Sequence, residues 1–181
     1  VLFSASPNVR VSYMRIIHCT RKLLKEIDVP LVEPDKIPVP TEGLGNWYAN
    51  LLRIDRRKCL LFTNEKSLYS FLIPKVLKAN LKNIEQEFLI NLSYNLQYEG
   101  FGLEVINMVM QEYREIGFAK TASKRVLGCM NQLAFEYEVF IEEKEGLENI
   151  RILEMNRDIN RTILKGLKFL HPIDALRNLL N

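Results

Sequence analysis

The sequence has few of the residues that organise disulfide-rich, metal-bound or low-complexity proteins. Among its 181 residues are three cysteines, two histidines, eight glycines and seven prolines. The cysteines lie at long, unequal spacings without a Cys-x-x-Cys pair, which fits neither a secreted disulfide framework nor a zinc knuckle. So few glycines and prolines exclude a fibrous or disordered chain. No apolar run reaches the roughly 18 residues of a membrane-spanning helix, so we expect no membrane partner.

The two histidines, His18 and His171, are far apart and give no metal-ligand spacing. We therefore expect neither a metal nor another cofactor. The odd set of cysteines lies inside apolar runs, where thiols are usually inert packing groups. These features favour a protein of the reducing cytoplasm.

The charges are grouped along the chain, although the net charge of +3 is too small to indicate nucleic-acid binding by itself. Residues 47–66 carry five basic and two acidic groups, residues 118–129 carry three basic and no acidic groups, and residues 130–149 carry one basic and six acidic groups. This pattern predicts separate basic and acidic surface patches.

Strand-like runs occur at residues 15–19, 47–54 and 58–63, and the last two predict a hairpin with a polar, basic turn. The first run passes directly into a short helix that Thr20 is placed to cap. Prolines spaced through residues 29–45 predict an extended surface loop. Residues 67–73 fit a strand or a helical turn.

Apolar residues at helical spacing predict four further helices, over residues 84–96, 103–113, 123–143 and 173–180. The fold class is therefore α+β: a small, mostly antiparallel sheet with a tryptophan-bearing hairpin, packed by four to six helices. An all-helical domain is the alternative.

One domain is expected over residues 14–181. Residues 1–13 lack the basic start and apolar core of a secretory signal, and we interpret them as a leader or upstream extension. The polar segment at residues 156–161 is expected to hold the C-terminal part to the body through side-chain bonds to backbone.

Three blocks of the sequence resemble a bacterial family of uncharacterised domains of unknown function: HCTRKLL at residues 18–24, LGNWYANLLRIDRRKCLLFTNEKSLYSFLIP at residues 44–74, and GFAKTASKRVLGCMNQLAF at residues 117–135. The resemblance extends over nearly everything from Met14 onwards. It implies a cysteine-threonine strand-to-helix start, a tryptophan-bearing hairpin with an arginine-rich turn, and a lysine-threonine segment that opens a helix. It implies no activity or catalytic residue. The chain departs from the family pattern in its first thirteen residues and at Gln132, where an acidic residue is more frequent.

The strongest chemical signal is a cationic, hydroxyl-bearing segment that opens a long helix. Free N–H groups at a helix N-terminus, together with hydroxyls and cations, can bind an anion. The alternative is that Thr121 or Ser123 simply caps the helix and the cations are solvated. The segment is not a Walker A loop, because the GxxxxGK[ST] pattern is absent. The candidate anion-binding residues are Lys120, Thr121, Ser123, Lys124 and Arg125.

A second basic group lies at the hairpin turn, where Arg56 and Arg57 can grip phosphates or can be solvated turn residues. Aromatic and amide side chains give further pocket candidates, although a lone tryptophan in a strand is usually part of the core. These pocket candidates are Trp47, Asn50, Asn64 and Asn131.

Three functions remain open at this point. The first is a cytoplasmic bacterial binding module for a phosphate-bearing ligand, either a phosphorylated small molecule or a nucleic acid. The second is a small enzyme in which Thr63, Asn64, Lys120, Thr121 and Asn131 converge in a polar cleft. The third is a protein-interaction domain that uses the acidic residues from Glu136 to Glu148. The sequence does not decide whether the protein is an enzyme.

Overall fold

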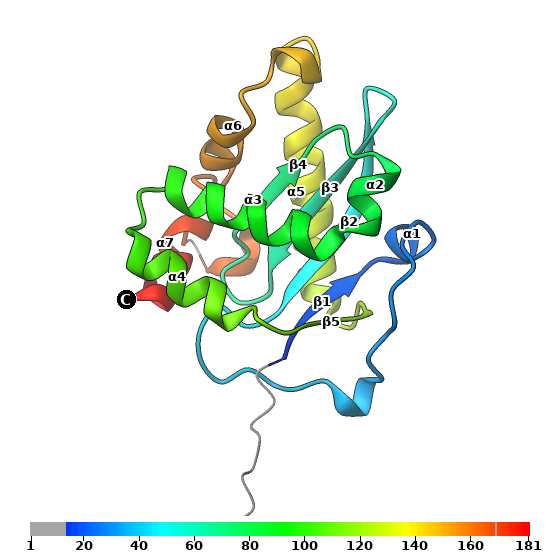
Figure 1. Ribbon diagram of the computed structural model, residues 1–181. Helices are drawn as coiled ribbons and strands as arrows, with labels where there is room; N and C mark the ends of the chain where they lie inside the picture. Colours follow the sequence, from blue (N-terminus) through cyan, green and yellow to red (C-terminus); the bar gives the residue numbers. More distant parts are fainter. Residues whose placement is uncertain (1–13, 169) are drawn as a thin grey trace, which may run out of the picture.

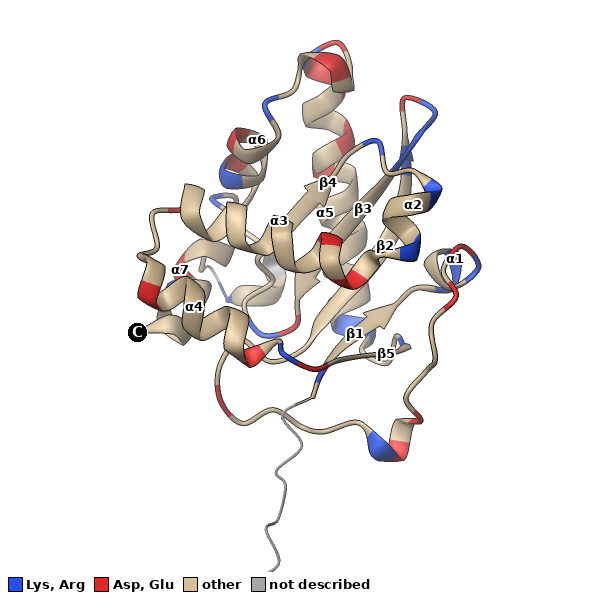
Figure 2. Cartoon of the chain, viewed as in Figure 1, with Lys and Arg blue, Asp and Glu red and all other residues tan. Residues whose placement is uncertain are grey.

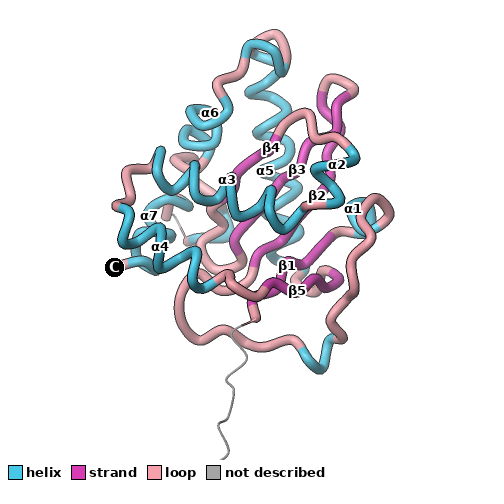
Figure 3. Tube along the Cα trace, in the orientation of Figure 1, coloured by secondary structure: helices cyan, strands magenta, loops and turns pink. Residues whose placement is uncertain are grey.

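The computed structural model describes residues 14–168 and 170–181, so the expected leader at residues 1–13 lies outside the described residues. A five-stranded sheet forms the centre of the molecule (Figures 1 and 3). β1 pairs in parallel with both β2 and β5, whereas β2 with β3 and β3 with β4 are antiparallel. The strands are β1 (Arg15–Cys19), β2 (Trp47–Ile54), β3 (Arg57–Asn64), β4 (Ser70–Ile73) and β5 (Ile116–Lys120), in the spatial order β4-β3-β2-β1-β5.

The α+β class is confirmed, but the sheet is mixed rather than mostly antiparallel. The sequence pattern locates strands without specifying their neighbours, and both connections that make parallel pairs span long, non-local segments. β5 is also absent from the sequence prediction, because IGFAK contains a glycine and an alanine on one face and shows little apolar alternation. Residues 67–73, which the sequence leaves open, contain the strand β4.

Seven α-helices lie in the described part of the chain, more than the expected four to six. The additional helices, of five and eight residues, are too short to show a clear helical period. No helix within residues 14–168 or 170–181 is long and apolar enough to cross a membrane. The helices are α1 (Arg21–Leu24), α2 (Lys78–Lys82), α3 (Ile84–Tyr98), α4 (Leu103–Glu112), α5 (Lys124–Glu143), α6 (Ile152–Ile159) and α7 (Pro172–Leu180), and the short 3-10 turns are Pro34–Lys36, Leu147–Asn149 and Lys165–Leu167.

Helices cover both faces of the sheet. In Figure 1, α3 and α4 lie in front of the strands and α5 lies behind them. The front face buries a core with α1, α3, α4 and α7, in which Trp47, Phe71 and Phe88 meet edge to face or stacked. The back face buries a second core with α5 and α6. This two-sided burial explains why most residues of β1 to β4 are inaccessible to solvent.

The outer edge of β4 is closed by side chains of α6. Asn160 accepts a hydrogen bond from Ser70 N at 2.8 Å and donates to Ser70 O at 2.6 Å. Asn156 accepts from Leu72 N at 3.0 Å and donates to Leu72 O at 3.4 Å. Two amides one helical turn apart thus replace a neighbouring strand, which protects an edge that would otherwise be open. The expectation for residues 156–161 is confirmed.

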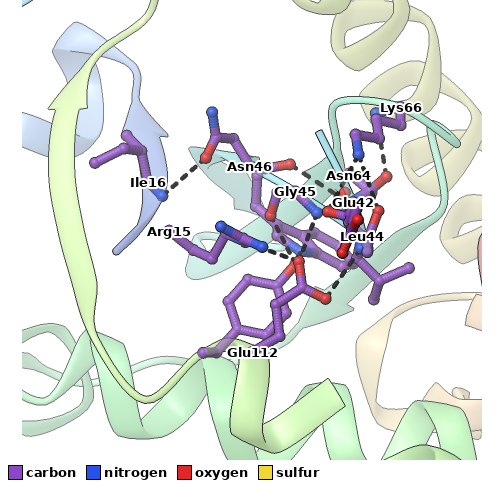
Figure 4. Close-up of polar contacts among 12 residues, drawn as sticks. Arg15, Ile16, Glu42, Leu44, Gly45, Asn46, Asn64, Lys66 and Glu112 are labelled. Carbon is purple, nitrogen blue, oxygen red and sulfur yellow. Dashed lines mark hydrogen bonds and ion pairs between the residues drawn. The ribbon is translucent and has the colours of Figure 1, made fainter. Parts of the chain in front are cut away.

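The amino-terminal end of β1 is held by a carboxylate from α4 (Figure 4). Glu112 accepts hydrogen bonds from Arg15 Nε, Leu44 N and Gly45 N at 2.8 to 3.0 Å. Gly45 has φ of +73°, a conformation that favours glycine. The loop that precedes β2 is therefore fixed by an anion from the protein itself.

Candidate anion-binding site

The chain leaves the carboxyl ends of two neighbouring parallel strands toward opposite faces of the sheet. Cys19 at the end of β1 lies beside Lys120 at the end of β5. After β1 the chain enters α1, which packs on the front face, whereas after β5 it enters α5, which packs on the back face. In open sheets a crevice forms where connections diverge in this way, and ligands commonly bind there. The sequence-predicted segment of residues 120–125 lies at this crevice.

Two backbone N–H groups in the first turn of α5 remain free. Ser123 caps the helix, since its hydroxyl accepts a hydrogen bond from Val126 N at 3.3 Å. Lys124 N and Arg125 N have no acceptor among the described residues. The partial positive charge of these two N–H groups, and their direction out of the helix N-terminus, favour the binding of an anion. The capping alternative is thus correct for Ser123, and it still leaves two donors for a ligand.

Tyr48 of β2 supports the start of α5. Its hydroxyl oxygen accepts a hydrogen bond from Ser123 N at 3.1 Å. Burial raises the pKa of the Tyr48 phenol, so it keeps its proton at neutral pH. Within residues 14–168 and 170–181, that O–H has no acceptor. Tyr48 therefore adds a neutral hydrogen-bond donor beneath the first turn of α5.

His18 of β1 lies between Tyr48 and β5. The imidazole stacks on the Tyr48 ring, with ring centres 4.7 Å apart, and its Nδ1 is 2.8 Å from Lys120 O. A carbonyl oxygen only accepts hydrogen bonds, so Nδ1 carries a proton and donates to Lys120 O. His18 is 4% exposed, and Nε2 has no partner in the described chain.

Next to His18 on the same face of the sheet, Thr20 donates a hydrogen bond to Asn50 Oδ1 at 2.8 Å. Thr20 is the residue before α1, yet its hydroxyl makes no capping bond. The sequence-predicted cap is therefore wrong, because the Asn50 amide competes for this hydroxyl. Asn50 thus lies beside Thr20, directly after the end of β1, and its place in a pocket stays a prediction.

The cations at this end of the sheet have no carboxylate partners. Lys120 is exposed, and alternation along β5 places it on the side of α1, whereas Lys124 lies on the side of α5. A separate cleft of about 420 Å³ lies farther along β2 and is lined by Lys22 of α1, by Lys25 directly after α1 and by Arg53 of β2. In the described residues none of these five cations forms a salt bridge. Glu26 and Glu138 also line the cleft, but Glu26 is bound to Lys58.

Two other predicted residues of the segment are placed differently. Thr121 is partly buried and makes no hydrogen bond in the described chain. The Arg125 guanidinium donates to Glu65 O at 2.9 Å, so it also tethers α5 to the end of the hairpin.

The arginine turn is separate from this crevice. Asp55 and Arg56 have φ of +48° and +61°, which is the geometry of a type I′ hairpin turn. Six residues of extended strand separate Tyr48 from the last residue of β2, a distance of about 20 Å. Arg56 and Arg57 therefore do not join the residues around Lys120 in one small site.

The remaining pocket candidates do not line the crevice. Trp47 is fully buried and donates to Tyr113 Oη at 2.6 Å. Asn64 is fully buried and donates to Leu44 O at 2.9 Å, so it organises the loop before β2. Asn131 is exposed on α5.

The cleft expected for an enzyme does not form from its named residues. Thr63 is fully buried, and its hydroxyl is the one buried side-chain polar atom that lacks a partner in the part of the chain described. The Asn64 amide is bound to the loop before β2, and Asn131 lies on an exposed side of α5. These residues do not converge in one cleft, because Thr63 and Asn64 are consecutive residues of β3 and their side chains point to opposite faces of the sheet.

The acidic residues gather on the C-terminal half of α5 and beyond it (Figure 2). Some of them already have partners. Glu136 accepts hydrogen bonds from Gln132 and Thr162, and Glu148 pairs with Lys75 at 2.7 Å. Glu138 and Glu142 are exposed.

Comparison with known families now adds to this geometry. The family model described as "Domain of unknown function (DUF6933)" matches residues 16–175. The chain belongs to the DUF6933 family. The resemblance to a family of unknown function is thus confirmed, and none of the curated proteins compared with this chain matches it. The matched range includes every residue of the crevice in this DUF6933 domain.

Sequence reasoning does not find His18 or Tyr48 as site residues. The available signal is weak. Both are aromatic side chains with polar atoms, and they lie side by side near the carboxyl end of β1, where ligands commonly bind in sheets of known strand order. Only the parallel pairing of β1 with β2 and β5 brings them to the start of α5.

Proposed function

We propose that this protein is a cytoplasmic bacterial binding module for a phosphate-bearing ligand, and that the ligand binds where β1 and β5 end. The observation that carries the proposal is the meeting of free Lys124 and Arg125 N–H groups with cations that lack carboxylate partners. A phosphate accepts several hydrogen bonds and carries negative charge, so it matches both features.

The charge arrangement supports a ligand with more than one anionic group. Across β1, Lys120 is level with Ala49 of β2, two strand spacings or about 10 Å away, and Arg53 lies four residues, or about 13 Å, farther along β2. Lys124 and the first turn of α5 can hold one phosphate, and Lys22, Lys25 and Arg53 can hold a second group in the cleft. Pyrophosphate is a suitable probe of the first turn of α5, and larger phosphorylated molecules test whether the cleft also takes part.

The test is a titration of the protein with pyrophosphate, followed by isothermal calorimetry and thermal melting. We expect the wild-type melting temperature to rise with pyrophosphate. Lys120→Ala and Lys124→Ala, combined, should abolish this rise and change the ligand-free stability by no more than about 0.5 kcal/mol, as is usual for surface substitutions. Lys78→Ala on α2 is the matched control, and it should bind as the wild type does.

Two results would contradict the proposal. One is the absence of any effect of pyrophosphate, phosphate or phosphate esters on the wild-type protein. The other is a loss of several kcal/mol of stability in the ligand-free Lys120→Ala protein, which would make Lys120 a structural residue.

A nucleic acid is the second candidate, because α1, α2 and the β2–β3 turn all carry Lys or Arg residues (Figure 2). A surface of this kind binds the phosphate backbone with steep salt dependence. Affinity for a short DNA or RNA should then fall steeply between low and moderate salt, and Arg56→Ala with Arg57→Ala should reduce the slope. A flat salt response would exclude this version and leave the small-ligand version intact.

A further inference from the structure

The charges of α5 are arranged against the dipole of the helix. A helix dipole favours acidic groups at the N-terminus and basic groups at the C-terminus. In α5 the first turn carries Lys124 and no acidic residue, whereas the last turn carries Glu142 and Glu143 and no basic residue. Among the described residues, neither Lys124 nor Glu142 forms a salt bridge that offsets this arrangement. A second helix that runs antiparallel to α5 would bring opposite charges to both ends.

The exposed residues of α5 form one stripe that faces away from the sheet. Leu133, near the middle of the helix, is fully buried against the back face. At about 100° per residue, the stripe lies within about 40° of the direction opposite to Leu133. The exposed residues of the stripe are Lys124, Gly128, Asn131, Phe135, Glu138 and Glu142.

Two residues of this stripe are unusual for a helix surface that faces only water. Gly128 lies inside the helix, where glycine is less favourable than alanine. A Cβ atom at Gly128 would meet nothing within 4 Å, so packing inside the chain does not require a glycine there. Phe135 is 65% exposed. A glycine allows a neighbouring helix to approach closely, and an exposed phenylalanine is stabilised when it is covered, so both features fit a helix packed on this face.

The stripe is complementary to itself about a two-fold axis at the level of Leu133. Antiparallel packing around such an axis pairs residues that lie at equal distances on either side of it. Lys124 then faces Glu142 of the second copy, because both are nine residues, or about 13 Å along the helix, from Leu133. The partly buried Leu127 likewise faces Val139 of the second copy. The charge reversal along α5 therefore becomes attraction at both ends of the contact.

We propose that this protein forms a symmetric dimer, in which α5 packs antiparallel against α5 of a second copy of the chain. The two Phe135 side chains cover each other near the axis, and two Lys124–Glu142 pairs close the ends. This interface goes beyond the proposed function, but it shares one residue with the proposed anion site. A phosphate bound at the start of α5 competes with Glu142 of the second copy for Lys124, and this single consequence rests on the proposed function.

Sedimentation velocity of the full chain over a series of concentrations measures the dimer. We expect a reversible monomer–dimer equilibrium that weakens as salt rises, because salt screens exposed charge pairs. Glu142→Lys places two lysines opposite each other at both ends of the contact and should raise the dissociation constant about ten-fold. Lys124→Glu should have the same effect. Both variants should remain folded, since each substitution improves the charge at its end of the helix.

The double variant, Lys124→Glu with Glu142→Lys, tests the pairing directly. It restores both pairs in reversed order and should recover the wild-type dissociation constant. Glu104→Lys, on the exposed side of α4, makes the same charge change as Glu142→Lys and is the matched control, which should dimerise as the wild type does. Phe135→Ser should abolish the dimer without loss of helix in circular dichroism. A chain that stays monomeric at its highest soluble concentration, or a double variant no better than the single variants, would overturn the dimer.

Pyrophosphate distinguishes failure of the dimer from failure of the proposed function. Competition for Lys124 predicts that pyrophosphate raises the dimer dissociation constant more than sodium chloride does at the same ionic strength. A dimer that pyrophosphate leaves unchanged supports the interface and contradicts the place of Lys124 in the anion site. A monomeric chain that still binds pyrophosphate overturns the interface and leaves the proposed function standing.

Discussion

The amide pair that closes the edge of β4 gives the sharpest stability prediction. Asn160 is fully buried and serves Ser70 N and Ser70 O at once. Asn160→Leu keeps a side chain of similar size and removes both bonds. Ser70 O retains the Tyr137 hydroxyl at 3.3 Å, but Ser70 N is left without an acceptor.

The magnitude follows from these contacts. A buried backbone N–H without a partner costs about 1–3 kcal/mol, and the lost bonds to Ser70 O and Asn156 O add about 1 kcal/mol. We therefore expect Asn160→Leu to reduce the free energy of unfolding by about 2–4 kcal/mol. Urea denaturation followed by circular dichroism measures this change through the midpoint, with an unchanged slope. Asn178→Leu, on the exposed side of α7, is the control and should change stability by no more than about 0.5 kcal/mol.

Asn160→Asp separates the acceptor from the donor. The carboxylate can still accept from Ser70 N, but it faces Ser70 O and Asn156 O without a proton to donate. Burial and these carbonyls raise the folded-state pKa of the introduced carboxyl above its unfolded value of about 3.9. The raised pKa means that stability is retained below the unfolded pKa and lost as pH rises through the folded pKa. If Asn160→Leu unfolds at the same urea concentration as the wild type, or the Asn160→Asp deficit does not grow with pH, the edge-closing role is refuted.

Three further predictions concern other parts of the molecule. Arg161→Met should destabilise the protein by about 3 kcal/mol, because the buried Glu99 carboxylate loses both bonds to Arg161 and keeps only a 3.4 Å bond from the Tyr69 hydroxyl. Glu99→Gln combined with Arg161→Met should recover much of this loss in urea denaturation, and no recovery would contradict the pairing argument. Arg56→Gly should stabilise the protein by about 1 kcal/mol, since φ of +61° strains an arginine but not a glycine, and a lower thermal midpoint would contradict it. Burial raises the pKa of the Cys19 thiol to about 12, so at pH 8 the thiol keeps its proton; a disulfide reagent should label Cys19 only on unfolding, and rapid labelling of the folded protein would show that the burial is wrong.

The sequence alone was sufficient for features that depend on local periodicity and turn chemistry. The strands of the hairpin, α3, α4, α5 and α7 follow from apolar spacing, because each element must bury one face whatever its neighbours are. The role of residues 156–161 also follows, since asparagine side chains can replace a neighbouring strand. The three sequence blocks were likewise enough to indicate a family of unknown function.

Tertiary structure decided which strands are neighbours, and with them the composition of the candidate site. A five-residue strand such as β5 carries no information about its partner, yet its parallel pairing with β1 brings Lys120 to His18. The same pairing separates Arg56 from Lys124, two cations that sequence patterning treats alike. Charged and hydroxyl-bearing residues can be identified from the sequence. Whether they lie close together in space depends on the order and direction of the strands, which the long connections set. His18 Nδ1 finds its hydrogen-bond acceptor only because this pairing brings the Lys120 carbonyl, 102 residues away in the sequence, to 2.8 Å.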